Sequence, residues 1–304
     1  MYQLLNEISL PYDLRKVKKD SFNIFDNMYG GILYAKNGRV PIFILVPRED
    51  AISINLNASE DVKVLRSILS KYKVNVVRGG RRQGLSTHYA TFGTSCNRYK
   101  AGLSSKLPYN TSGDEDILLR TFFNRADSIA KKFLPYGVLR WLKECKDMCG
   151  DKNSYVAQDE NEKSNGIAWS SIATTYNYMS PAHTDEDAFM SSLFVSHIPK
   201  EKEKLAINVQ YEMDQEVAMY FCFPTEGVAV ALRPGDVLMF NPVFYHCASQ
   251  RCEFYKLEDI FLTSLYLKNK QLSRNENELL LTSKSEWFSQ ISQSMNSGKK
   301  KDKN

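Results

Sequence analysis

From residue 166 onward the chain consists of short stretches rich in β-branched and aromatic residues, and this pattern constrains the fold most strongly. Such residues favour strands. Turn signals separate most of the stretches, as at Pro224–Gly227 and Arg233–Asp236. The expected strands lie at 167–178, 190–197, 206–211, 217–223, 227–232, 236–240, 243–247 and 260–267. Seven or eight short strands at this spacing predict a sandwich or jelly roll.

The preceding residues predict a mixed α/β organisation. Arg39–Pro47 is a short apolar run that favours a buried strand, and Lys73–Arg78 favours another. Ser59–Tyr72 has apolar residues at helical spacing. Ile117–Met148 is the longest helical pattern, which Pro135-Tyr136-Gly137 interrupts. The sequence therefore predicts an α+β fold in which flanking helices support a β core.

These patterns divide the chain into four expected regions. A mixed α/β and helical support region is followed by an acidic loop, the jelly-roll core and a C-terminal segment with a basic tail. Their predicted bounds are 1–150, 151–164, 165–270 and 271–304. The apolar content of 43% and charged content of 25% are ordinary for a globular protein.

Composition also restricts the compartment and the class of protein. No apolar run approaches the roughly 20 residues that a membrane span needs, so we expect no membrane association. The N-terminal residues lack the charged-then-apolar order of a secretory signal. The six cysteines are scattered and do not form a disulfide framework. We therefore expect a cytoplasmic or nuclear protein in a reducing compartment. The oligomeric state stays open.

One segment has an uneven charge. Residues 62–113 contain ten Lys or Arg residues and no Asp or Glu, whereas acids and bases are mixed elsewhere. A segment of this kind attracts polyanions, which makes nucleic acid a candidate partner. A solvated basic face without a partner is the alternative.

Three residues in the β region have the chemistry of a metal site. His183 and Asp185 are two positions apart, so in an extended segment both side chains lie on the same face. His246 follows 63 residues later, at the end of an expected strand that a Pro-Gly-Asp turn precedes. Two imidazoles and one carboxylate form the facial triad of non-haem Fe(II) oxygenases, which leaves coordination positions open. A surface His-x-Asp pair with a separate core His246 is the alternative.

At these residues the chain resembles the Fe(II)/2-oxoglutarate-dependent dioxygenase superfamily, and within it the TET/JBP-like branch. The resemblance lies in NYMSPAHTDED (177–187), PGDVLMFNPVFYH (234–246) and TSLYLK (263–268), and covers about residues 165–270. It implies a double-stranded β-helix in which His183, Asp185 and His246 are the catalytic iron ligands. It also implies Fe(II), the cosubstrate 2-oxoglutarate and O₂, with ascorbate as an additional reductant.

The residue that would hold the distal carboxylate of 2-oxoglutarate is not evident. In the TET/JBP-like branch it is an Arg about 15–17 residues after the second His, a place that Phe261, Leu262 and Thr263 occupy here. Lys256, ten residues after His246, fits the spacing of the prolyl-hydroxylase-like branch. The other candidate cosubstrate-binding residues are Arg251, Ser264, Tyr266 and Tyr176. Solvated loop charges are the alternative for Lys256 and Arg251.

The resemblance implies oxidation of a substrate C–H bond coupled to decarboxylation of 2-oxoglutarate to succinate. The basic segment and the TET/JBP-like pattern favour a nucleic-acid base as substrate. The spacing of Lys256 favours a protein side chain, as in prolyl hydroxylation, and a small metabolite stays open. A non-catalytic jelly-roll binding module and a metal enzyme without 2-oxoglutarate are the remaining alternatives.

Overall fold

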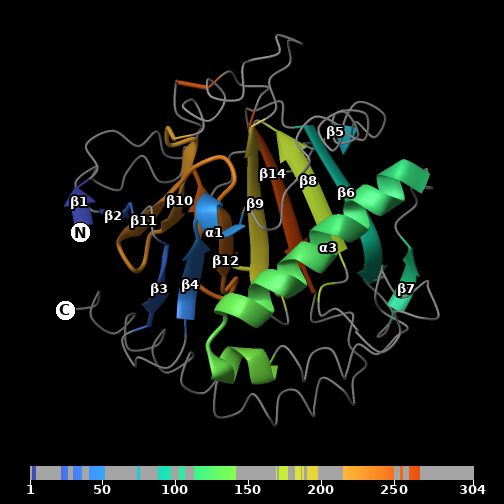
Figure 1. The fold of residues 1–304 in the computed structure, drawn as a ribbon, viewed down its shortest axis with the longest axis horizontal. Coiled ribbons are helices and arrows are strands. Elements are labelled where there is room, and N and C mark those ends of the chain that lie inside the picture. The colour runs from blue at the N-terminus through green and yellow to red at the C-terminus, as the bar shows by residue number, and fades with distance from the viewer. Residues whose placement is uncertain are drawn as a thin grey trace.

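The protein is described by a computed structural model, in which two β-sheets dominate (Figure 1). The described residues are 2–4, 22–26, 30–35, 41–51, 74–75, 88–96, 103–106, 113–141, 169, 171–176, 182–185, 187, 190–197, 215–249, 254–255 and 260–267. For Glu49, Tyr176 and residues 2–4, 74–75, 88–96, 103–106, 113–116 and 118–121, only the backbone is described.

The larger sheet has nine strands and is antiparallel throughout. Its order is β3-β4-β12-β9-β14-β8-β6-β5, and β7 pairs with β6. The bounds are β3 Gly31–Tyr34, β4 Pro41–Val46, β5 Val74–Asn75, β6 His88–Cys96, β7 Leu103–Lys106, β8 Ser171–Tyr176, β9 Ser191–His197, β12 Val237–Phe240 and β14 Ile260–Tyr266.

The smaller sheet has five strands in the order β1-β2-β11-β10-β13. All its pairs are antiparallel except β2 with β11, which is parallel. The bounds are β1 Tyr2–Leu4, β2 Asn23–Phe25, β10 Met219–Phe223, β11 Val228–Leu232 and β13 Cys247–Ala248.

The path of the chain between the sheets is that of a jelly roll. From β8 and β9 in the larger sheet it crosses to β10 and β11 in the smaller one. It then returns to β12, crosses again to β13, and ends in β14 between β8 and β9. The described residues are thus mostly β rather than the predicted α+β, and the two sheets with this alternation are consistent with a double-stranded β-helix.

The main hydrophobic core lies between the two sheets. Alternate residues of facing strands meet there, such as Phe221 of β10 and Phe240 of β12, whose ring centroids are 4.7 Å apart. Phe43 of β4 stacks on Phe223 of β10 at 5.5 Å, which joins an N-terminal strand to the same core. Strands from the first hundred residues are therefore part of the layers that build the jelly roll.

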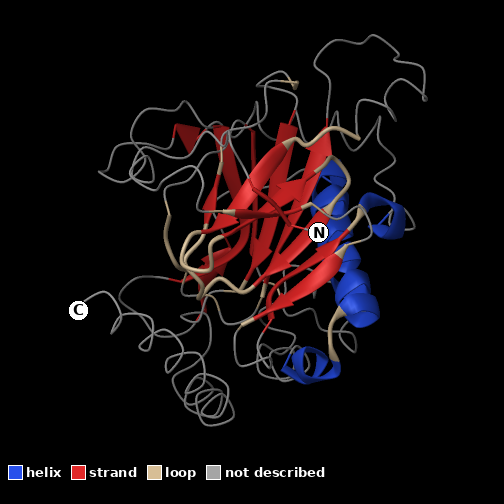
Figure 2. Ribbon diagram, turned by 90° about the vertical axis from the view of Figure 1, so that its left-hand side faces the viewer, coloured by secondary structure: helices blue, strands red, loops and turns tan. Residues whose placement is uncertain are grey.

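A long helix covers the outer face of the larger sheet (Figures 1 and 2). Helix α3, Gly113–Phe133, buries Phe122, Phe123, Ala126, Ile129 and Ala130 along one side. The ring of Phe122 packs edge-on against Phe194 of β9 at 5.4 Å. Phe194 neighbours core residues Leu193 and Val195 but points to the opposite face, because side chains alternate along a strand.

Most of the predicted elements that fall on described residues are confirmed, with shorter bounds. The predicted strand at 39–47 is β4, that at 73–78 contains β5, and the long helix ends at Phe133 before Pro135. Residues 136–141 form a further helical segment, and α1 spans Arg48–Ala51. The predicted helix at 59–72, the strand at 206–211 and the C-terminal segment lie outside the described residues. Among the described helices, none has the length and apolarity that crossing a membrane requires.

Candidate metal centre

Two short segments carry the predicted metal ligands. His183 and Asp185 lie in residues 182–185, and His246 lies directly before β13. His183 and His246 exchange two backbone N–H to carbonyl hydrogen bonds, each 2.9 Å long. The N–H of Asp185 donates to the carbonyl oxygen of Pro242 at 2.9 Å. This short antiparallel pairing brings together residues that are 63 positions apart in the sequence.

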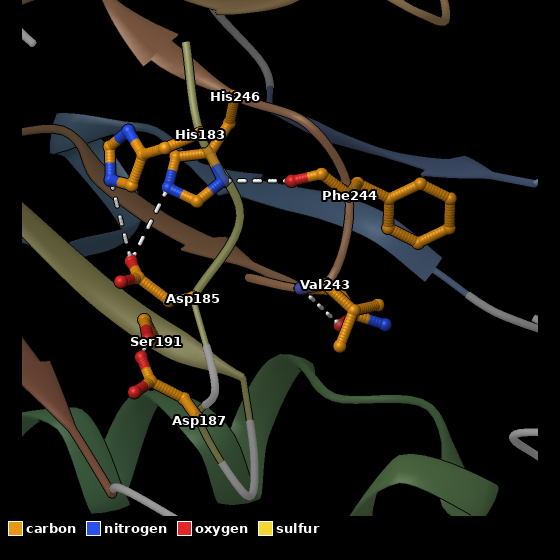
Figure 3. A network of polar contacts seen from close by, with 8 residues as sticks. His183, Asp185, Asp187, Ser191, Val243, Phe244 and His246 are labelled. Atoms are coloured by element: carbon orange, nitrogen blue, oxygen red, sulfur yellow. Dashed lines mark hydrogen bonds and ion pairs between the residues drawn. The ribbon is translucent and has the colours of Figure 1, made fainter. Parts of the chain in front are cut away.

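The three side chains converge on one point (Figure 3). Asp185 Oδ2 lies 3.6 Å from His183 Nε2 and 3.6 Å from His246 Nε2. One ligand atom from each residue lies within 4.8 Å of the other two. Divalent ions bind nitrogen and oxygen at about 2.0–2.2 Å, so adjacent ligands at right angles lie roughly 3 Å apart. Small side-chain rotations therefore suffice for all three atoms to bind one ion.

His246 is the most rigidly held of the three residues. Its side chain is only 4% exposed; its ring stacks on Phe221 at a centroid distance of 5.4 Å and contacts the tilted ring of Phe240 at 4.9 Å. Its Nδ1 lies 2.8 Å from the carbonyl oxygen of Phe244. Because a carbonyl oxygen only accepts, Nδ1 is the nitrogen that carries the proton, and Nε2 presents its lone pair toward Asp185. The hydrogen bond to Phe244 therefore favours the Nδ1–H tautomer, in which Nε2 is free to bind a metal.

The other two residues lie on an accessible side of the site. The side chain of His183 is 32% exposed and that of Asp185 is 34% exposed. One side of the three-residue group is therefore packed against core phenylalanines, and the other opens toward solvent. A metal bound here would have coordination positions left for further ligands.

A second carboxylate, which sequence reasoning did not single out, supports the segment that carries Asp185. Asp187 is 3% exposed and accepts a hydrogen bond from the hydroxyl of Ser191 at 2.9 Å (Figure 3). This bond ties Asp187, two positions after Asp185, to the first residue of β9. His183, Asp185 and Asp187 are spaced two residues apart, and this alternation in the sequence could have identified Asp187 as a neighbour of the site.

The expected strand at 243–247 is wrong. Residues 242–244 form a turn, in which the N–H of Phe244 donates to the carbonyl oxygen of Asn241 at 3.2 Å. Pro242 has no N–H to donate to a neighbouring strand, which favours a turn over a continued ladder. His246 is consequently delivered by a turn after β12, and only Cys247–Ala248 continue as β13.

The candidate cosubstrate-binding residues are only partly placed. Ser264 lies on β14, two residues from Leu262, whose side chain is in the core between the sheets. Ser264 therefore faces the interior of the jelly roll and is half-buried. Tyr176 is the last residue of β8, but its side chain lies outside the described residues, as do Arg251 and Lys256.

The two remaining histidines lie on other strands. His197 ends β9, is 7% exposed and packs edge-on against Tyr255 at 5.0 Å. The backbone of His88 begins β6 and pairs with Tyr176 of β8. Trp169, which precedes β8, is fully buried.

Two titratable groups elsewhere in the smaller sheet have shifted pKa values. Burial raises the pKa of Glu226, in the turn between β10 and β11, to about 7. A hydrogen bond with Cys247, and then burial, raise the pKa of the Cys222 thiol well above its usual value. Neither group is one of the three converging residues.

Comparison with known proteins identifies the fold through structure alone. No protein-family model and no curated protein matches the sequence. The structure of NgTET1 in complex with 5mC DNA matches with a TM-score of 0.52 and 12% identity, covering 82% of each chain. At this identity the match shows the fold.

Two prolyl hydroxylases match more distantly. The viral collagen prolyl hydroxylase of Paramecium Bursaria Chlorella virus-1 has a TM-score of 0.36 and 9% identity, covering 74% of this chain and 94% of the other. A Pseudomonas putida prolyl-4-hydroxylase has a TM-score of 0.36 and 10% identity, covering 75% and 92%. Only the NgTET1 match supports the fold argument. The resemblance seen in the sequence is confirmed: the chain is structurally similar to the Fe(II)/2-oxoglutarate dioxygenases and carries a candidate His-Asp-His metal site.

Proposed function

We propose that the chain is a non-haem Fe(II) dioxygenase that uses 2-oxoglutarate and O₂ to oxidise a C–H bond of its substrate. One observation carries this proposal: His183, Asp185 and His246 converge on the accessible side of a jelly roll. The fold match to NgTET1 supports it.

The three residues fit Fe(II) by their chemistry. Two neutral imidazole nitrogens and one carboxylate oxygen on one side of an ion are the ligand set of non-haem Fe(II) oxygenases. The hydrogen bond from His246 Nδ1 to the Phe244 carbonyl oxygen holds Nε2 ready for coordination. When bound, the iron supplies the oxidising chemistry, with electrons from decarboxylation of 2-oxoglutarate.

The protein contributes orientation and exclusion of water. Phe221 and Phe240 pack against the His246 ring, so water is kept from the inner side of the site. Asp185 contributes negative charge, and its backbone bond to Pro242 keeps it beside His246. Cosubstrate and substrate approach from the exposed side of His183 and Asp185.

The distal carboxylate of 2-oxoglutarate is proposed to bind at Ser264 and neighbouring groups. Ser264 faces the interior of the jelly roll and offers a hydroxyl donor. Lys256 and Arg251 remain the proposed sources of charge at this carboxylate, since such an anion is commonly held by a cation. The backbone of Tyr176 pairs with Phe261, which lies on the opposite face of β14 from Ser264.

The proposed substrate is a nucleic-acid base. The structure matched is a TET protein in complex with 5mC DNA, and the segment 62–113 carries ten basic residues without an acid. Part of this segment lies at the end of the larger sheet that carries the candidate metal residues, where Phe240 of β12 pairs with Ser191 of β9. The Gly93 end of β6 pairs with Ser171 of β8, whose partner on β14 is Tyr266. In the adjacent row, Leu265 of β14 pairs with Ser192 of β9, which directly follows Ser191, the residue that binds Asp187.

Release of succinate tests the enzymatic proposal. We expect purified protein with Fe(II), ascorbate and O₂ to convert 2-oxoglutarate to succinate, and D185A to lose this activity. H88Q is the matched control, because His88 lies in β6 outside the three-residue group. If the wild-type chain releases no succinate, the dioxygenase proposal fails and a jelly-roll binding module is favoured.

Salt-dependent retention of DNA or RNA oligonucleotides tests the proposed substrate class separately. Lys106 lies in β7, whose pairing with β6 is at Thr94–Cys96, next to Gly93. We expect the triple variant R98A/K100A/K106A to bind more weakly. The slope of the logarithm of its binding constant against the logarithm of the salt concentration should fall by roughly one unit for each lost phosphate contact. The variant R78A/R81A/R82A, with substitutions in the connection between β5 and β6, is the comparison. Unchanged retention in both variants removes the nucleic-acid proposal and leaves the metal site untouched.

A further inference from the structure

Two cysteines face each other across the smaller sheet. Cys222 of β10 pairs with Cys247 of β13, and both are free thiols with 0% exposure. Their direct pairing puts both side chains on the same face of the sheet. They belong to a small apolar cluster on the outer face of this sheet, which also contains Phe22, Ile24, Ala229 and Ala231.

The spacing of the two strands suits a disulfide bond. The N–H of Ser249 donates to the carbonyl oxygen of Tyr220 at 2.9 Å, so Cys222 and Cys247, two residues further along, occupy a hydrogen-bonded position of the ladder. Cα atoms at such positions are about 5.5 Å apart, within the range of about 4.4–6.8 Å that disulfides adopt. Cross-strand Cβ atoms are about 4.5–5.5 Å apart, whereas a disulfide brings them to about 3.5–4.5 Å. Formation of the bond therefore draws the strands together.

Both cysteines are neighbours of the metal centre. Cys247 directly follows His246, and Cys222 directly follows Phe221, whose ring stacks on His246 at 5.4 Å. Ala182, which precedes His183, packs against the same apolar cluster. A movement of β13 therefore reaches two of the three converging residues.

We propose that Cys222 and Cys247 form a reversible cross-strand disulfide when the protein meets a peroxide, and that this bond displaces His246. When β13 opens locally, one thiol loses its proton and the thiolate sulfur attacks the peroxide O–O bond, which yields a sulfenic acid, while the proton goes to the departing oxygen as water or alcohol. The second thiol then attacks the sulfenic sulfur, which forms the S–S bond and releases a water. The two thiols lose two electrons and two hydrogens in total, and the peroxide accepts both.

Strand β13 is the element that yields. It has two residues, and among the described residues its other side is held only by the short bridge between His246 and His183, whereas β10 is held by five residue pairs with β11. Local opening at such a short strand also gives the oxidant access to thiols that are buried in the closed sheet. The consequence for metal binding rests on the proposed iron site, but the covalent step does not.

The covalent step is tested by peptide mapping. The folded full-length chain is treated with hydrogen peroxide, alkylated and digested. We expect a linked pair of peptides containing Cys222 and Cys247, with the mass of two hydrogen atoms lost, and its disappearance after dithiothreitol. C145A/C149A is the matched control and retains the link. Absence of the linked pair, or its appearance only in denatured protein, overturns the inference.

The effect on the site has a readout that needs no metal. In protein labelled at histidine, the imidazole NMR signal assigned to His246 through H246Q should shift on oxidation and return on reduction. Co(II) affinity, measured by titration, should fall about tenfold or more, as when groups that orient a ligand are lost. C222A should show neither change. A linked pair without a shift of the His246 signal contradicts the proposed coupling, whether or not the site binds metal.

Discussion

At the scale of single residues, the candidate metal centre combines one closely packed histidine with two accessible residues. His246 is fixed by two phenylalanine rings and by the carbonyl oxygen of Phe244. His183 and Asp185 are each about a third exposed. The buried imidazole therefore sets where an ion sits, and the accessible pair completes the site where cosubstrate and substrate enter.

Glu226 offers a test of pH dependence away from the site. Its pKa is raised to about 7 because burial disfavours the carboxylate. An acid whose folded pKa exceeds its unfolded value keeps its proton better in the folded state, so stability falls as the pH rises from about 4.5 to about 7. We expect E226Q, which is neutral throughout, to unfold at a higher temperature than wild type at pH 8.

The same comparison at pH 4.5 is the internal control for Glu226. Wild-type Glu226 is then largely protonated in the folded chain, so the gain from E226Q should shrink. Thermal unfolding followed by circular dichroism measures both values. An equal gain at the two pH values would show that burial of the charge is not its cause.

At the scale of elements, the turn before β12 positions the segment that ends in His246. Gly235 has φ +93°, a conformation that favours glycine, and an added Cβ would lie 2.7 Å from Arg48 Cγ. Asp236 reinforces the turn, because its carboxylate accepts from the N–H groups of Arg233 at 2.7 Å and Arg48 at 3.0 Å. The turn thus joins helix α1 to β12.

Substitution G235A should destabilise the protein by about 1–3 kcal/mol, since it forces an alanine into the left-handed region. G137A is the matched control. A Cβ at Gly137 meets nothing within 4 Å, and Gly137 lies in the helical segment 136–141. The change in the free energy of unfolding relative to wild type, measured with urea, should therefore be clearly larger for G235A than for G137A or opposite in sign. Equal losses would show that the turn conformation is not what G235A disturbs.

Helix α3 contributes stability from the outer face of the larger sheet. Phe122 is fully buried against Phe194, so F122A should lower the free energy of unfolding by about 3–5 kcal/mol. I117A, at a residue of the same helix that is 65% exposed, should change it by less than about 0.5 kcal/mol. Folded F122A should keep the Co(II) affinity of wild type. A large loss of affinity in the folded variant would mean that α3 shapes the metal centre.

At the scale of the whole molecule, the sequence indicated the jelly roll because its strands are short, alternating and separated by turn residues. The close approach of His183 and Asp185 to His246 was also predictable, since residues two apart share a face of a strand. The turn at 242–244 is not evident from local propensity, because the strand-favouring residues Val243 and Phe244 mask the turn signal of Pro242. Local propensity cannot show that strand pairing has ended.

Other features depended on tertiary structure that a sequence does not display. The phenylalanines around His246 come from β10 and β12, and their roles follow from how the sheets pack. The entry of β4 into the sheet beside β12 is a long-range pairing with no local signal. Cys222 and Cys247 lie opposite each other because β10 pairs with β13, and the sequence does not show the register of two strands that are not consecutive.

The most direct test of the central claim is the metal content of the protein after loading with Fe(II) without oxygen. The structure predicts one iron per chain in wild type and in H88Q, and almost none in H183A, D185A or H246A, provided that each variant remains folded by circular dichroism. If folded D185A and H246A retain a full equivalent of iron, then His183, Asp185 and His246 are not its ligands and the proposed function loses its basis.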